Sequence, residues 1–175
     1  DWILSELGML YAGGVNVPLS IRLHETELIF RLKHSGSKYI FVSGAHARKV
    51  EEIREDLPEL EKIIYIDDKE NPGKNDANYR DLIAQGEKYL EIHEDEVNAI
   101  WESIQPDDLA NISYTSGTTA DPKGIMLSQL NYAANVVQSN TLMELQSDWR
   151  TLAILPWDHA FAHTACLYAF MFKGA

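Results

Sequence analysis

Short β-rich runs alternate with amphipathic segments in the N-terminal part of this chain. Residues 38–42 (K-Y-I-F-V) and 62–66 (K-I-I-Y-I) have the composition of buried strands. Residues 25–34 and 45–55 carry apolar side chains at helical spacing. Strands that alternate with helices of this length predict a mostly parallel sheet with helices packed on its faces. The expected fold class is therefore α/β.

Other segments complete this outline. The remaining elements predicted before residue 129 are a helix at 2–12, a strand at 15–18, a polar loop at 67–78, a helix in two pieces at 79–105, and strands at 111–115 and 124–127. Gly13 and Gly14 are expected to end the first helix, because glycine tolerates a positive φ.

The C-terminal part predicts further helices. Ser128 is placed to cap a helix that runs from Gln129 to about Leu145. Its expected apolar face consists of Leu130, Ala133, Ala134 and Val137. A strand is predicted at residues 151–155, and the apolar run at 165–172 predicts a buried helix, because it is shorter than the roughly 20 residues that span a bilayer.

Charge and cysteine content restrict the functional class. The formal net charge of −12 argues against nucleic-acid binding, which depends on Lys and Arg that neutralise phosphates. The single cysteine, Cys166, excludes an intramolecular disulfide and fits a reducing compartment. The first residues do not have the pattern of a signal peptide. We expect a cytoplasmic protein, and we leave peripheral attachment to the inner face of the membrane and a homodimer as open alternatives.

Residues 114–124 (Y-T-S-G-T-T-A-D-P-K-G) form the most informative segment. Four hydroxyl side chains surround Gly117, and small consecutive residues allow backbone N–H groups to turn toward an anion. Lys123 adds a positive charge suited to phosphate. A plain polar hairpin turn is the alternative reading of the composition.

A Walker P-loop does not fit this segment. That pattern requires a second glycine directly before the lysine and a helix directly after it. Here the second glycine position holds Pro122, Gly124 follows Lys123, and the next residues predict a strand.

The same segment resembles the phosphate loop of the adenylate-forming superfamily, Y-T-S-G-T-T-G-x-P-K-G, with Ala120 in place of one glycine. This superfamily includes acyl-CoA synthetases, luciferases and peptide-synthetase adenylation domains. Residues 10–19, 34–42 and 105–110 also resemble family segments, and residues 155–164 resemble the L-P-x-x-H-x-F segment of long-chain fatty-acid synthetases. The resemblance implies that residues 1–175 are part of the large N-terminal AMP-binding domain, cut at both ends and without the C-terminal domain.

The resemblance also implies residue roles. The residues expected to bind the β- and γ-phosphates of ATP are Thr115, Ser116, Gly117, Thr118, Thr119 and Lys123. Thr118 is expected to approach Mg²⁺, and His159 and Phe161 are expected to line the acyl pocket. No residue of the chain is assigned as catalytic.

The implied reaction joins a long-chain fatty acid to AMP and then to coenzyme A. ATP, Mg²⁺ and coenzyme A are the implied cofactors and substrates. The family's adenine motif, ribose-binding aspartate and C-terminal lysine are not among these residues, so we expect the chain alone to be inactive.

Three alternatives remain. The first is an amino-acid or aryl-acid adenylation domain, the second is a non-catalytic nucleotide-binding module, and the third is a structural domain in which the loop only turns the chain. A zinc site built from His159, His163 and Cys166 is disfavoured, because the surroundings are apolar and no fourth ligand is near in the sequence.

Overall fold

The computed structural model describes residues 1–115 and 122–175, which divide into two compact units. The first unit consists of Asp1–Gly14 and Ile21–Ile104. The second consists of Val15–Ser20 and Gln105–Ala175. Each unit is described by itself.

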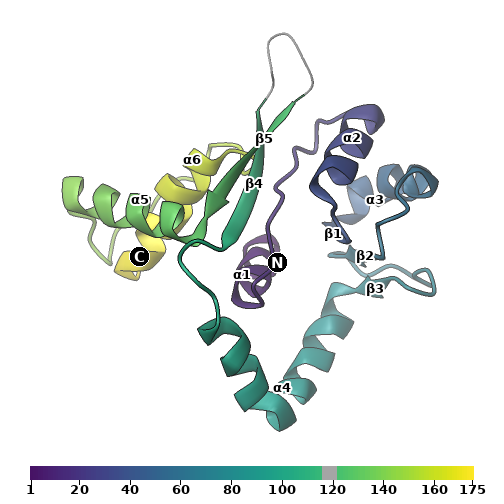
Figure 1. Ribbon diagram of the computed structural model, residues 1–175, viewed down its shortest axis with the longest axis horizontal. Helices are drawn as coiled ribbons and strands as arrows, with labels where there is room; N and C mark the ends of the chain where they lie inside the picture. Colours follow the sequence, from purple (N-terminus) through teal and green to yellow (C-terminus); the bar gives the residue numbers. More distant parts are fainter. Residues whose placement is uncertain (116–121) are drawn as a thin grey trace. The chain divides into compact units, whose positions relative to one another are not determined.

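A small parallel sheet forms the centre of the first unit (Figure 1). Its strands are β1 (Tyr39–Val42), β2 (Lys62–Tyr65) and β3 (Ala77–Asn78), in that order. The central strand β2 carries the core, since Ile63, Ile64 and Tyr65 are all buried. The predicted parallel α/β arrangement is therefore confirmed, and the predicted loop at 67–78 contains a strand only at its last two residues.

Helices precede, separate and follow these strands along the chain, as predicted. They are α1 (Trp2–Tyr11), α2 (Glu25–Ser35), α3 (Gly44–Glu52), the short 3₁₀ helix η1 (Arg54–Asp56) and α4 (Tyr79–Glu102). Gly13 follows α1 with a φ of 70°, which confirms the expected glycine at the helix end.

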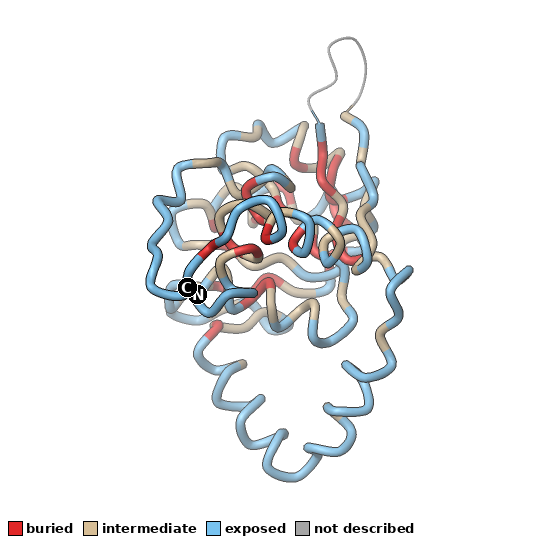
Figure 2. Tube along the Cα trace, turned by 90° about the vertical axis from the view of Figure 1, so that its left-hand side faces the viewer, coloured by how far each residue is buried: buried red, intermediate tan, exposed pale blue. Residues whose placement is uncertain are grey.

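The long helix α4 is bent and exposed. His93 has non-helical backbone angles (φ −122°, ψ 29°), so the helix has the two predicted pieces. In Figure 2 both legs of the bent helix are pale blue, and Tyr79 is its buried residue.

An antiparallel hairpin and a group of helices make up the second unit. The hairpin pairs β4 (Leu109–Thr115) with β5 (Lys123–Ser128). The strand predicted at 15–18 is reduced to one parallel bridge between Asn16 and Asn111.

The polypeptide leaves β5 directly into α5 (Gln129–Leu142). Ser128 Oγ accepts a bond from Asn131 N at 3.3 Å, and Asn131 Oδ1 accepts one from Ser128 N at 3.0 Å. The predicted Ser128 cap is confirmed, and this reciprocal pair sets the turn from strand to helix.

The C-terminal helices are α6 (Ala160–Ala162), the π-helical segment η2 (His163–Tyr168) and α7 (Ala169–Lys173). Of these, η2 and α7 pack against α5 (Figure 1, yellow against green). The helix predicted at 165–172 is confirmed. Its predicted burial is wrong at the end, where Met171 and Phe172 are exposed, and right at Leu167 and Ala169.

Two further predictions for this unit are wrong. Residues 151–155 form no strand in the described part of the chain, and Leu152 and Ile154 are exposed. A strand needs a neighbouring strand to pair its backbone groups, and the described residues provide none there.

The second error concerns the buried face of α5. Leu130 and Val137 are about half exposed, whereas Val136 and Asn140 are buried. Asn140 Nδ2 donates to Ala169 O at 3.2 Å. The helix therefore packs through a face rotated from the most apolar one, because the contact with α7 decides its orientation.

Candidate functional site

The β4–β5 hairpin carries the predicted phosphate-binding residues. Thr115 and Lys123 are paired across the two strands at the end of the hairpin, and both are exposed. The structure thus brings together two of the six residues predicted from the sequence. Ser116, Gly117, Thr118 and Thr119, together with Ala120, lie outside the described residues.

Close packing explains the glycine that follows Lys123. A Cβ atom at Gly124 would lie 2.9 Å from Ile112 Cγ2 and 3.5 Å from two ring carbons of Tyr114. Tyr114, opposite Gly124 in the pairing, is 9% exposed. Gly124 therefore allows the two strands to lie close together directly beside Lys123.

The base of the hairpin is held by buried polar groups. Ser113 Oγ donates to Asn111 Oδ1 at 2.8 Å, and both side chains are buried. Asn16 N donates to Ala110 O, and Ile112 N donates to Asn16 O, each at 2.9 Å. This support was not predicted from the sequence, although the i, i+2 spacing of Asn111 and Ser113 places both on one face of the strand.

The predicted acyl-pocket residues lie on a different segment of the same unit. His159 precedes α6 and Phe161 lies within it, and both side chains are exposed, Phe161 by 69%. His159 N donates to Pro156 O at 3.2 Å, and Ala162 N donates to His159 O at 2.9 Å. These turns hold both side chains at the surface of the second unit.

His163 is the buried neighbour of this segment. Its side chain is 0% exposed, and its Nε2 lies 2.6 Å from Trp157 O. From the sequence, the role considered for His163 was that of a metal ligand. Within residues 1–115 and 122–175, no three His, Cys, Asp or Glu side chains are grouped to hold a metal ion.

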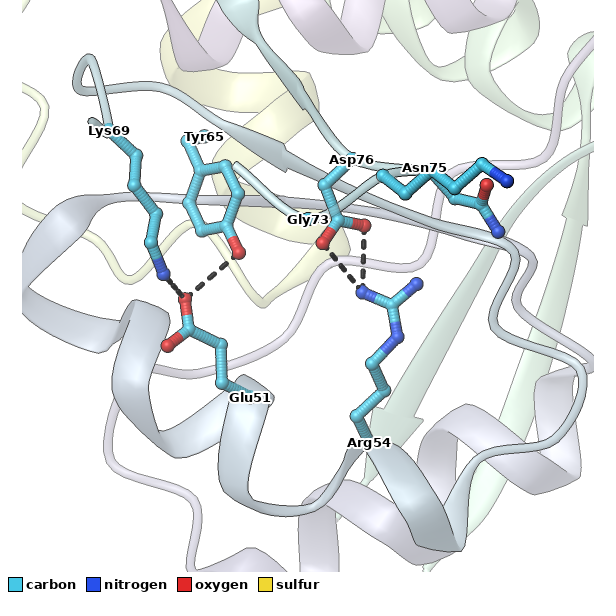
Figure 3. Close-up of a pocket in the computed structure, with 8 residues that line it drawn as sticks. Glu51, Arg54, Tyr65, Lys69, Gly73, Asn75 and Asp76 are labelled. Carbon is cyan, nitrogen blue, oxygen red and sulfur yellow. Dashed lines mark hydrogen bonds and ion pairs between the residues drawn. The ribbon is translucent and has the colours of Figure 1, made fainter. Parts of the chain in front are cut away.

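An open pocket of about 420 Å³ lies in the first unit (Figure 3). Its lining residues are Glu51, Arg54, Tyr65, Lys69, Gly73, Lys74, Asn75 and Asp76. None of them was predicted as a site residue.

Two ion pairs cross this pocket. Arg54 Nη1 donates to both carboxylate oxygens of Asp76 at 2.7 Å, and Lys69 pairs with Glu51 (Figure 3). Asp76 Oδ1 also accepts a bond from Ile63 N at 2.9 Å, which ties the polar loop to the central strand. The Arg54–Asp76 pair therefore secures the loop before β3.

Glu51 accepts hydrogen bonds from two side chains of this pocket, Tyr65 and Lys69. The bond from Lys69 holds the pKa of Glu51 below its ordinary value, and the bond from the Tyr65 hydroxyl at 2.9 Å acts in the same direction. Burial raises the pKa of Tyr65, and its bond to Glu51 raises it further. The cluster joins α3 to β2 and the loop that follows it.

In the parts of the chain that the structure describes, no helix combines the length and the apolar character needed to cross a bilayer.

The family of the chain follows from a sequence match over its whole length. The sequence pattern of the family described as AMP-binding enzyme matches residues 1–175. The chain belongs to this family.

Several kinds of protein have sequences similar to this chain. The chain is 29% identical to the long-chain-fatty-acid–CoA ligase ACSBG2 of Gallus gallus, over 93% of the chain and 22% of the ligase. It is 30% identical to the chalcone synthase cfoA of Aspergillus candidus, over 98% of the chain and 6% of that protein. The chain therefore spans a small part of the length of these relatives.

A solved structure confirms the fold. The anthranilate CoA ligase AuaEII, in complex with anthranoyl-AMP, aligns with a TM-score of 0.79 at 22% identity. The alignment covers 99% of the chain and 32% of the ligase. At this identity the likeness shows the fold alone.

Proposed function

We propose that the protein containing this chain activates a carboxylic acid with ATP and transfers the acyl group to coenzyme A. Residues 1–175 would be part of its N-terminal AMP-binding domain. The observation that carries this proposal is the pairing of Thr115 with Lys123 at the end of a hairpin, within a chain that matches the AMP-binding enzyme family throughout.

The role of the hairpin would be electrostatic. Lys123 and Thr115 are directly paired across the two strands, so a triphosphate at the hairpin end would meet a cation and a hydroxyl donor together. Such donors stabilise the charge that develops on the leaving pyrophosphate. They also hold the α-phosphorus in place for attack by the carboxylate. Ser116, Gly117, Thr118 and Thr119 would complete this phosphate grip.

Magnesium fits such a site, because Mg²⁺ is commonly held by phosphate oxygens, waters and few protein oxygens. It would neutralise part of the triphosphate charge. Thr118 is the proposed protein group nearest to the ion. Thr118 lies outside the described residues, and Thr115, which is described, carries the same kind of hydroxyl group.

A long-chain fatty acid is the substrate that we favour. Support comes from the segment around His159 and Phe161, which resembles fatty-acid synthetases, and from the similarity to the chicken ligase. The fold is shared with an anthranilate CoA ligase, so an aryl acid is the second candidate. A cytoplasmic location, peripheral membrane attachment and a homodimer remain predictions.

The decisive experiment measures acid-dependent ATP–pyrophosphate exchange by the full-length protein. The panel should contain long-chain fatty acids, aryl acids and amino acids, followed by assay of the coenzyme A thioester. We expect exchange and thioester formation with fatty acids. A preference for aryl or amino acids would change the assigned substrate but support the proposed adenylation activity. Absence of exchange with every acid would reject the proposed enzymatic activity.

Titration of Mg-ATP separates the two non-enzymatic alternatives. Saturable heat without exchange would indicate a nucleotide-binding module. No saturable heat would indicate a structural turn. For residues 1–175 alone we expect no pyrophosphate exchange at the rate of the full-length protein.

A further inference from the structure

His163 closes a short segment of the chain onto itself. Its Nε2 lies 2.6 Å from the backbone oxygen of Trp157, six residues earlier. A backbone carbonyl can only accept a hydrogen bond, so Nε2 carries the hydrogen and donates it. The bond joins the first residue of η2 to the residue after Pro156.

The closed segment contains both predicted acyl-pocket residues. His159 and Phe161 lie between Trp157 and His163, and both are exposed, whereas His163 is fully buried. A buried donor thus secures the backbone that presents two exposed side chains. Without this bond the segment would regain backbone freedom, because fewer of its dihedral angles would be restrained.

Aromatic rings fix the imidazole in turn. The ring of Tyr132 from α5 lies nearly parallel to His163, with centroids 6.4 Å apart. Tyr168 meets His163 edge to face at 6.0 Å, and Trp157 lies 6.2 Å away. Tyr132 and Tyr168 also contact each other at 5.3 Å. The orientation of the imidazole is therefore set by α5 and η2 together.

The local helix geometry is consistent with a functional role. His163 begins a π-helical segment, His163–Tyr168. Such segments are rare and occur frequently at functional sites.

We propose that His163 is a positioning residue, which orients His159 and Phe161 for binding of the carboxylic acid by holding the carbonyl of Trp157. This inference rests on the proposed function. It assigns His163 no contact with ATP or with the reacting atoms. Its loss should therefore act on the acid and leave the use of ATP nearly unchanged.

The test compares variants of the full-length protein. His163→Leu fills the space without a donor, and His163→Gln keeps an N–H group at nearly the same reach. We expect His163→Leu to raise the KM for the acid about tenfold, which is about 1.4 kcal/mol of lost binding. We expect His163→Gln to stay within about threefold of the parent, and both variants to keep the KM for ATP within about twofold.

The control is Leu167→Met, one turn along the same segment. Leu167 is 7% exposed, and the change alters buried packing without touching the bond to Trp157. It should leave the KM for the acid unchanged. An equal rise in both KM values for His163→Leu, or a rise for Leu167→Met as large as that for His163→Leu, would overturn the inference.

A folding failure of His163→Leu would not leave the question open. The test then compares His163→Gln with His163→Asn, since the shorter amide of Asn does not reach the carbonyl of Trp157. A higher KM for the acid in the Asn variant supports positioning, and equal values for Gln and Asn overturn it. Absence of exchange by the parent protein with every acid would instead reject the proposed function.

Discussion

Thr115 and Lys123 face each other across the β4–β5 hairpin, as the final pair of its register. The next pair inward is Tyr114 and Gly124, and a Cβ atom at position 124 would lie only 2.9 Å from Ile112 Cγ2. The hairpin end is thus supported by tight packing directly below the two exposed candidates for phosphate binding.

Replacing Lys123 should impair the use of ATP. We expect Lys123→Ala in the full-length protein to raise the KM for ATP about 10- to 100-fold, because a charge-assisted hydrogen bond is worth about 1.5–3 kcal/mol. The KM for the acid should change little. Steady-state kinetics with each substrate varied in turn provides the measurement. Lys88→Ala on the exposed helix α4 is the control, and equal losses for ATP and acid would contradict the assignment.

A methyl group at position 124 should destabilise the hairpin. The added Cβ would lie 2.9 Å from Ile112 Cγ2, so Gly124→Ala should lower the free energy of unfolding by about 1–3 kcal/mol. Urea denaturation of the single and double variants tests this cause. Ile112→Ala removes the clash, and the penalty of Gly124→Ala should then shrink. An identical penalty in both backgrounds would show that another contact is responsible.

Removing the Asp76 carboxylate should release the loop before β3. Its side chain is 5% exposed and accepts bonds from Arg54 and from Ile63 N. We expect Asp76→Ala to lower the free energy of unfolding by about 2–3 kcal/mol, since these are hydrogen bonds to a charged group beside a partly exposed arginine.

Another Asp–Arg pair of the same unit supplies the matched control. Asp68 and Arg80 are paired at 2.8 Å, with side chains 51% and 80% exposed. Asp68→Ala should cost less than about 0.5 kcal/mol. Similar costs for the two aspartates in chemical denaturation would mean that burial does not distinguish the pairs.

Glu51 should make stability depend on pH in the acid range. The bond from Lys69 lowers the pKa of Glu51 in the folded protein below its ordinary value of 4.5. The ionised carboxylate therefore contributes stability above about pH 4.5, and this contribution is lost as the pH falls through the folded-state pKa.

The comparison with Glu51→Gln isolates this effect. The stability difference between the parent and the variant should be full near pH 7 and should decline below about pH 4.5. Urea midpoints measured across this range provide the test. Lys69→Met should lessen the decline, because it removes the main cause of the lowered pKa. A difference that stays constant down to about pH 3 would rule out Glu51 as the titrating group.

Local sequence predicted several features correctly, because short-range signals such as caps, turn residues and alternating strand and helix segments indicate them. Ser128 caps α5 through Asn131, only three residues away. Gly13 ends α1 with a positive φ that other residues rarely adopt. The β-rich runs around Ile40 and Ile63 pair in parallel, because the helical segment between them requires a crossover connection.

Features that depend on contacts between different elements were missed. Leu130 and Val137 form the more apolar face of α5, yet Val136 and Asn140 are buried, because α7 packs there. Residues 151–155 have a strand composition but no strand beside them among the described residues. The bonds from Arg54 to Asp76 and from His163 to Trp157 join groups whose proximity no local pattern reveals.

By itself, the sequence determined the family, the α/β class and the hydroxyl-rich segment between Tyr114 and Gly124. These follow from composition, spacing and short-range hydrogen bonding, which act within a few residues of the chain. The tertiary structure decided that Thr115 is paired with Lys123, which side of α5 is buried, and that His163 holds the segment with His159 and Phe161. The reason is that these pairings and buried faces join residues of different strands, helices or turns, whose contacts exist only once the chain is folded.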